Sequence, residues 1–334
     1  MYLGNDLYIH ATGFAADARV TINSLNMHDP LYRPDLVSIL TACGTIFKKE
    51  EQTADAPQEE ASSDAASLTP ALASCFEEIR PMLDAFAGNV SVLYKDLTTG
   101  AAFRYRTDYR HPSASVIKLY LMAAMFRGFE DGEFSPEDRI PVPAADFVPS
   151  CGVLTYLDAD KNVSLRDLIE LMIIVSDNTA CNILVDFYGE ERLQSYINQT
   201  LGLHATSFQR KMFDSARAAR GMDNFTSTDE TAGLLEQIWN GTLVSEDASR
   251  QMLQMLEHQR LNGKIPFHLH AVRPKPVIAH KTGENDGVSH DVAIFEGDHP
   301  FLLLFMGSET DVPAWERMIG DLSLQIYEAH RQGC

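Results

Sequence analysis

Two groups of strand-like segments lie at opposite ends of the main part of this sequence, and a long helical region separates them. Near the start, residues 90–97 (VSVLYKDL) and 101–107 (AAFRYRT) are predicted to form a hairpin. Three more strand-like segments, KPVIAHKT, VSHDVAIF and FLLLFM, come after residue 274. If the first and last strands share one sheet, the residues between them form a separate helical layer. We therefore predict an α/β fold, with an antiparallel five-stranded sheet flanked by helices and an inserted all-α domain.

The helical segments have apolar residues at helical spacing. Those of the inserted region include SVIKLYLMAAMFRGF, SLRDLIELMIIV and NTACNILVDFYG. The predicted flanking helices are SLTPALASCFEEIRPMLDAF before the hairpin and PAWERMIGDLSLQIYEAHRQ at the end.

A segment poor in large apolar residues precedes the first predicted helix. Residues 49–68 are rich in Glu, Ala, Ser and Asp and cannot bury themselves, so we expect a flexible acidic linker. It separates a short N-terminal piece, residues 1–48, from a main domain over residues 69–334.

Composition excludes several classes of function. The chain has 27 Lys and Arg against 47 Asp and Glu, a net charge of −20 that would repel nucleic acid and anionic lipid. No apolar stretch is long enough for membrane insertion, and the N-terminus has no signal-peptide pattern. The five cysteines lack metal-ligand spacing, so we expect no metal and no other cofactor.

The motif Ser115-Val116-Ile117-Lys118 begins one of the predicted helices. Positions i and i+3 share a helix face, so the Lys118 amine is expected beside the Ser115 hydroxyl. Alone, the motif is more simply a capping serine and a surface lysine. The apolar residues that follow, however, predict a buried helix, and burial would lower the pKa of the amine toward that of a useful base.

Two further motifs could complete an acyl-transfer site. Ser176-Asp177-Asn178 joins two helical segments; its hydroxyl could relay a proton and its amide could hold a carbonyl, although such residues also serve as helix caps. Lys281-Thr282-Gly283 ends a strand, where the lysine would attract a carboxylate and the glycine would allow close approach. A plain strand end is the simpler interpretation of that tripeptide alone.

Taken together, SxxK, SDN and KTG in this order resemble the signature of class A β-lactamases and penicillin-binding proteins. The separations, 61 residues from Ser115 to Ser176 and 105 from Ser176 to Lys281, are also similar to those of that family. From about residue 68 onward, the chain resembles class A β-lactamase-like, penicillin-recognising serine hydrolases. The resemblance implies a β-lactamase/transpeptidase-like fold, an extracytoplasmic location, a monomer, and a β-lactam or peptidoglycan-like small-molecule substrate.

The resemblance also implies roles for individual residues. Ser115 would be the nucleophile, Lys118 its base and Ser176 the proton shuttle to the leaving nitrogen. Asn178 would bind the acyl-amide of the substrate, while Lys281 and Thr282, next to Gly283, would bind its carboxylate. The backbone N–H groups of Ser115 and Glu284 would form the oxyanion hole.

One departure from the family concerns deacylation. Active class A enzymes carry a loop glutamate in a Glu-x-x-Leu-Asn pattern, but the corresponding stretch here, FQRKMFDSARAARGMDNFTS, contains no glutamate. Asp214 is the candidate substitute, with a plain helix cap or solvated acid as the alternative. The main expectation is β-lactamase-like hydrolysis; a DD-peptidase or esterase, or a sensor that is acylated without turnover, stays open.

Residues 1–48 resemble the C-terminal end of NlpC-like cysteine peptidases. The segment LYIHAT would place His10 at the position of the family's catalytic histidine. The cysteine partner would lie before Met1, and Cys43 is on the wrong side, so we expect a partial domain without activity. A hairpin with an incidental histidine is the alternative.

Overall fold

The computed structural model describes residues 8–12, 19–23, 67–149, 151–157 and 161–333. The chain divides into two compact units, Met1–Ser62 and Ser63–Cys334. In the first unit, strand β1 (Tyr8–Thr12) pairs antiparallel with β2 (Arg19–Asn23). The predicted NlpC-like piece outside these two strands, and residues 49–66 of the predicted linker, lie outside the described residues.

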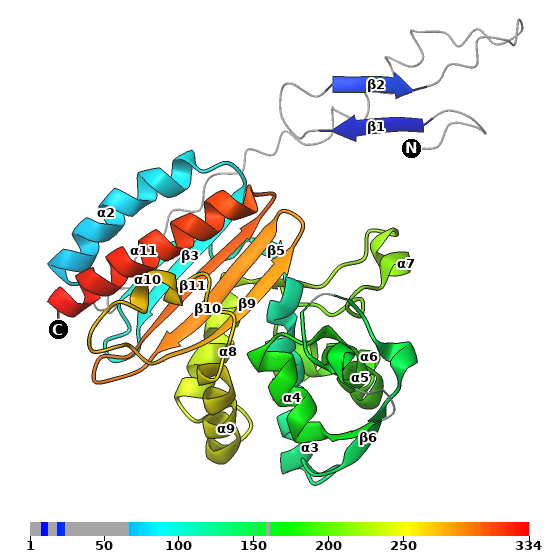
Figure 1. Ribbon diagram of the computed structural model, residues 1–334. Coiled ribbons are helices and arrows are strands. Elements are labelled where there is room, and N and C mark those ends of the chain that lie inside the picture. The colour runs from blue at the N-terminus through cyan, green and yellow to red at the C-terminus, as the bar shows by residue number, and fades with distance from the viewer. Residues whose placement is uncertain (1–7, 13–18, 24–66, 150, 158–160, 334) are drawn as a thin grey trace, which may run out of the picture. The chain divides into compact units, whose positions relative to one another are not determined.

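The second unit contains the predicted five-stranded antiparallel sheet (Figure 1). Its strands follow the order β4-β3-β11-β10-β9, so the first two and the last three strands predicted for the main domain do share one sheet. The strands are β3 (Asn89–Asp96), β4 (Ala102–Tyr105), β9 (Ile278–Asn285), β10 (Val288–Phe295) and β11 (Phe301–Ser308). The sequence did not predict two small sheets, formed by β5 (Arg110–Pro112) with β8 (Phe225–Ser227) and by β6 (Arg139–Val142) with β7 (Lys161–Ser164).

Helices cover both faces of the sheet (Figure 1). On one face lie α2 (Pro70–Ala85), α11 (Val312–Gln332) and the short α10 (Pro266–Leu269). The other face carries the helical part, made of α3 (Lys118–Glu130), α4 (Leu165–Ile174), α5 (Asn178–Tyr188), α6 (Glu190–Ser195), α7 (Ser215–Ala218), α8 (Thr228–Trp239) and α9 (Glu246–Glu257). Short turns of other helix types are η1 (Ala114–Ile117), η2 (Ala144–Asp146), η3 (Leu154–Tyr156) and η4 (Tyr196–Thr200).

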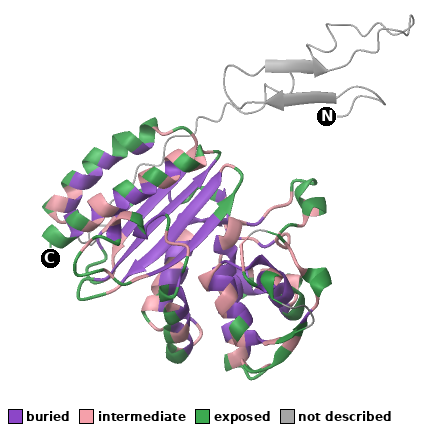
Figure 2. Cartoon of the chain, viewed as in Figure 1, coloured by how far each residue is buried: buried purple, intermediate pink, exposed green. Residues whose placement is uncertain are grey.

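The sheet separates two hydrophobic cores (Figure 2). Side chains alternate along a strand, so Leu93 of β3 faces the helical part while Val92 and Tyr94 pack under α2 and α11. Every residue of β10 and β11 is buried. Burial on both faces explains why FLLLFM is continuously apolar rather than alternating.

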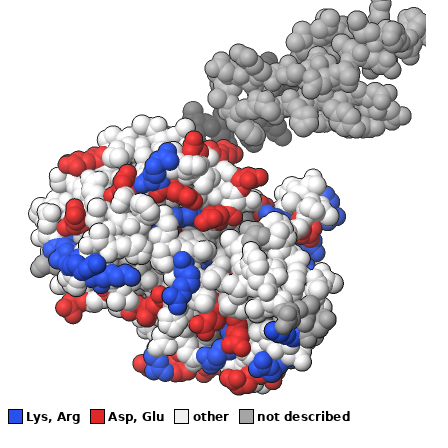
Figure 3. Space-filling model, viewed as in Figure 1, with Lys and Arg blue, Asp and Glu red and all other residues white. Residues whose placement is uncertain are grey.

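The surface agrees with the acidic composition. Figure 3 shows acidic side chains spread over both the sheet part and the helical part on the face in view. None of the helices that the structure describes combines the length and apolar character needed to cross a membrane.

Candidate functional site

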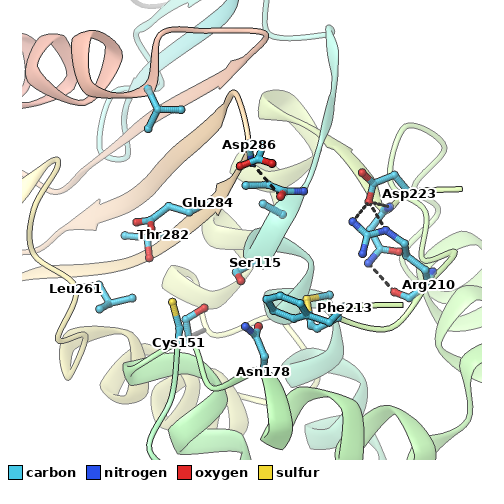
Figure 4. Close-up of a pocket in the computed structure, with 16 residues that line it drawn as sticks. Ser115, Cys151, Asn178, Arg210, Phe213, Asp223, Leu261, Thr282, Glu284 and Asp286 are labelled. Atoms are coloured by element: carbon cyan, nitrogen blue, oxygen red, sulfur yellow. Dashed lines mark hydrogen bonds and ion pairs between the residues drawn. The ribbon is translucent and has the colours of Figure 1, made fainter. Parts of the chain in front are cut away.

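A cavity of about 500 Å³ lies where the edge strand β9 meets η1 and the start of α5 (Figure 4). Ser115, Asn178 and Thr282 line it together. Ser176 and Glu284 also reach the cavity, so all three sequence motifs contribute to one site. The structure thus brings together residues that are more than 160 positions apart in the chain.

Ser115 lies in the 3₁₀ turn η1 rather than in the predicted α-helix, which begins only at Lys118. The preceding residue, Ala114, has a φ of 44°, a conformation that is strained for a residue with a side chain. The sharp turn presents Ser115 to the cavity, while the next two residues, Val116 and Ile117, are buried.

Lys118 is completely buried, as the apolar sequence around it predicted. Its Nζ donates hydrogen bonds to the Ser176 carbonyl (2.8 Å), the Ser176 Oγ (3.1 Å) and the Asn178 Oδ1 (2.7 Å). Burial lowers the pKa of the Lys118 amine, and nearby Cys181, Cys151 and Asp177 partly oppose the shift. Lowering the pKa makes the uncharged amine of Lys118, which directly follows the serine turn, more accessible as a base.

Ser176 joins the two buried lysines of the site. It connects α4 to α5 with a φ of 55°, and it is 2% exposed. Its Oγ accepts hydrogen bonds from Lys118 Nζ (3.1 Å) and from Lys281 Nζ (3.0 Å). A hydroxyl held between two amines can pass a proton from one side to the other.

Lys281 is also completely buried, on β9. Besides Ser176, its Nζ donates to the Thr282 carbonyl at 2.7 Å. Burial first, and then the positive charges of Lys118 and Lys264, hold the pKa of Lys281 well below its usual range. An anionic substrate group placed beside Lys281 would raise its pKa and favour its charged form, because it supplies a counter-charge.

Gly283 permits close contact between β9 and the serine turn. A Cβ at Gly283 would lie 3.1 Å from the Val116 side chain and 3.2 Å from the Ser113 carbonyl. Even an alanine at this position would require these neighbours to shift. The next residue, Glu284, lines the cavity at the exposed end of the strand.

Asp177, the middle residue of the second motif, fixes the surroundings of the site. It caps α5 by accepting from the Ala180 N–H at 2.9 Å, and its other oxygen accepts from Val153 N–H (2.7 Å) and Leu154 N–H (3.0 Å). These bonds hold the loop that places Cys151 on the cavity wall.

The loop opposite β9 places apolar side chains in the cavity, and Asp214 is not among the lining residues. The Asp214 carboxylate instead caps α7 through the Arg217 N–H (2.9 Å) and pairs with the Arg217 side chain (3.4 Å). Met212 and Phe213 line the cavity. Asn182 fixes Met212 from both sides, donating to its carbonyl (2.9 Å) and accepting from its N–H (2.8 Å).

Sequence analysis did not identify these loop residues as part of the site. Asp223 is the one acid of this loop that lines the cavity, and it is paired with Arg210 at 2.9 Å. Figure 4 shows Phe213 beside Asn178, with Arg210 and Asp223 at the far side of the loop. The sequence signal available was the missing glutamate, which indicated an altered loop but not which side chains would face the cavity.

Comparisons with known proteins agree with this geometry. A model of the β-lactamase enzyme family matches residues 74–330. β-Lactamase L2 of Stenotrophomonas maltophilia is 28% identical over 190 residues, which cover 57% of this chain and 62% of that protein. A β-lactamase of Rhodobacter capsulatus is 25% identical over 241 residues, covering 70% of this chain and 80% of that protein. The chain therefore spans less than two thirds of the first relative.

Solved structures share the fold. A β-lactamase of Sphaerobacter thermophilus DSM 20745 superposes with a TM-score of 0.69 at 29% identity, covering 78% of this chain and 96% of that one. A variant of PBP-A, solved as an acyl-enzyme complex with penicillin G, superposes with a TM-score of 0.70 at 24% identity, covering 79% and 100%. The fold is thus β-lactamase/transpeptidase-like, as predicted. The family match, the fold and the three motifs gathered in one cavity lead to one conclusion: the chain belongs to the β-lactamase enzyme family.

Proposed function

We propose that Ser115 is acylated by a β-lactam or a related peptide-like amide, with Lys118, Ser176 and Lys281 as the proton-handling groups. The observation that carries the proposal is the Ser176 hydroxyl, which bridges two buried lysines of lowered pKa beside the serine turn. Such a chain of proton carriers matches what acyl transfer from a serine requires.

The reaction begins when Ser115 Oγ attacks the carbonyl carbon of the amide. The hydroxyl proton passes to the uncharged form of the Lys118 amine, which accepts it on its free lone pair, and the developing negative charge on the carbonyl oxygen is stabilised by the N–H groups of Ser115 and Glu284. When the C–N bond breaks, Ser176 gives its proton to the leaving nitrogen and is resupplied by one of its two lysine neighbours.

The remaining residues bind the substrate. The Asn178 Oδ1 is held by Lys118, so its NH₂ group is the part that donates to the acyl-amide carbonyl of the substrate. Lys281 and Thr282 bind the carboxylate. Gly283 keeps the strand edge close to the serine turn, so that the Glu284 N–H can share the oxyanion with Ser115.

Deacylation is the slow step of the proposed reaction. Hydrolysis of the acyl-enzyme needs a base that activates water, and the loop presents Met212 and Phe213 where such a base would act. Asp214 is committed to its helix cap and to Arg217, which disfavours it as that base. A second candidate function is therefore a penicillin-binding peptidase, or a sensor whose adduct with β-lactam persists.

Intact-protein mass spectrometry over time tests both functions. The wild type and Ser115→Ala are mixed with penicillin and with nitrocefin. We expect an adduct on the wild type only, with slow decay. A fast-decaying adduct with product release would exclude the second candidate. An equal adduct on Ser115→Ala would overturn the proposed nucleophile.

The wider setting is also a proposal. Acting as a monomer on a small β-lactam or wall-peptide substrate, the protein would work outside the cytoplasm. The match to the β-lactamase enzyme family begins at residue 74, so it does not bear on residues 1–48. Their NlpC-like resemblance stays a prediction, which a longer gene product carrying an upstream cysteine domain would support.

A further inference from the structure

A buried lysine outside the three motifs lies beneath the end of β9. Lys264 precedes α10, and its side chain is 4% exposed. Its Nζ donates to the Gly283 carbonyl (3.3 Å) and to the His290 carbonyl (3.2 Å). It also pairs with the carboxylates of Glu284 (2.9 Å) and Glu316 (3.5 Å). Burying an ammonium is costly, so a buried lysine with four acceptors indicates a specific role.

The Gly283 carbonyl and the Glu284 N–H belong to the same peptide group. A trans peptide is planar, so its C=O and N–H point in opposite directions. Lys264 bonds the carbonyls of both Gly283 and His290, which are paired residues of β9 and β10. The Gly283 carbonyl is thus held on the β10 side, and the Glu284 N–H points toward the free edge of the sheet.

That free edge faces the serine. β9 is the last strand of the sheet, with β10 on one side only. Across the edge, Gly283 approaches Val116 and Ser113 of the serine turn, and both Glu284 and Ser115 line the cavity. A cation bonded to the carbonyl end of an amide also draws electron density toward that end, which makes the N–H a stronger donor.

We infer that Lys264 is a positioning residue of the oxyanion hole: it orients and polarises the Gly283–Glu284 peptide so that the Glu284 N–H stabilises the oxyanion formed at Ser115. The inference rests on the proposed acylation of Ser115. Lys264 is not among the residues that line the cavity.

The backbone next to Lys264 is held in place by a buried carboxylate. Asp291 Oδ2 accepts from the Ile265 N–H at 3.0 Å, and Asp291 Oδ1 pairs with His280 Nδ1 at 2.8 Å. Asp291 belongs to β10 and is completely buried, with 0% of its surface exposed. The lysine is therefore anchored to the same two strands whose carbonyls it bonds, which gives it a fixed position under the peptide.

The test compares Lys264→Met, which removes the charge at similar length, with Lys264→Gln, which keeps a neutral donor and protects folding. Lys95→Met is the matched control, because Lys95 lies on β3 of the same sheet and loses an ion pair to Glu236 (2.7 Å). Thermal denaturation confirms that each variant is folded. Acylation by penicillin is followed by stopped flow, and the acyl ester carbonyl is observed by isotope-edited infrared spectroscopy.

We expect Lys264→Met to slow acylation by about tenfold, less than the roughly 10²–10³-fold that follows loss of a whole oxyanion donor. The ester carbonyl band should move to higher wavenumber. Lys264→Gln should change both in the same direction by less, and Lys95→Met should change neither.

Two results would contradict different claims. If the wild type forms no acyl adduct, the proposed function fails. If the wild type is acylated but the folded Lys264 variants keep its acylation rate and carbonyl band, only the positioning role fails. A lower melting temperature with an unchanged band would reduce Lys264 to a structural residue.

Discussion

Replacing Met212 by glutamate should shorten the lifetime of the proposed acyl-enzyme. Met212 lines the cavity with Ser115, and Asn182 binds its backbone on both the N–H and the carbonyl side. Because these bonds use only the main-chain atoms of Met212, replacing its side chain leaves the backbone in place. Glutamate is close to methionine in length, so its carboxylate would enter the space that the thioether now occupies.

The magnitude follows from the chemistry of the missing base. A positioned general base accelerates proton transfer by about 10²–10⁴-fold. We expect the lower end of this range, about 10²-fold faster deacylation, equivalent to about 2.7 kcal/mol. Met212 is only half-buried, so a carboxylate there stays hydrated and the free energy of unfolding should fall by about 1 kcal/mol.

The assay is the decay of the penicillin adduct in the intact mass spectrum. Met212→Gln is the matched control, because it has the shape of glutamate without its basicity. We expect the adduct of Met212→Glu to decay about 10²-fold faster than those of the wild type and Met212→Gln. Equal decay in all three proteins would refute the argument that this position lacks only a base.

Three further predictions concern the motif residues, pH and a glycine. Lys118→Ala should slow labelling by a fluorescent penicillin by about 10²–10⁴-fold. In the wild type, the acylation rate should rise with pH through the lowered pKa of Lys118, because the base acts in its deprotonated form. Burial lowers the pKa of His111 to about 3 and that of His290 to about 4, so the unfolded chain binds more protons below about pH 6.5. The free energy of unfolding in urea should then fall on acidification, by about 1.4 kcal/mol per pH unit for each histidine, and His111→Gln should reduce that slope. Gly152→Ala should destabilise by at least about 1 kcal/mol more than Gly100→Ala in thermal denaturation, since both have positive φ but only Gly152 has Asp177 within 2.3 Å of the added Cβ.

The parts of the fold with a regular hydrophobic pattern were predictable from the sequence. The strands β3, β9, β10 and β11 lie where their apolar runs predicted, because burial on one or both faces leaves a repeat that can be read locally. The small β5–β8 and β6–β7 sheets were not predicted, because their strands are only three or four residues long. Strands this short form because of their pairing in the tertiary structure, and they are too short to show a hydrophobic pattern in the sequence.

The candidate site likewise has a part that the sequence predicts and a part that it does not. Ser115, Ser176 and Lys281 were identifiable because each belongs to a motif with known order and spacing. The start of α3 was misplaced by three residues, because the 3₁₀ turn at Ser115 depends on contact with β9, and Ala114 adopts its positive φ within that turn. Asp214 was chosen by residue type alone, and its local role as a helix cap removed it from the cavity.

Lys264 and Met212 show why motif reasoning stops short of mechanism. Neither residue belongs to a motif, and the position of each depends on contacts that form only after distant segments pack. Lys264 bonds a main-chain carbonyl of β9, and the main chain of Met212 is bonded by an asparagine of α5. Yet the two residues bear on the two steps of the proposed reaction, acylation and deacylation. Lys264 would support the peptide that stabilises the oxyanion during acylation, whereas Met212 lines the cavity in which we propose that a base for deacylation is missing. A site so arranged favours forming the acyl-enzyme over resolving it, and Lys264→Met with Met212→Glu should therefore move the balance in the same direction, toward a shorter-lived and less abundant adduct.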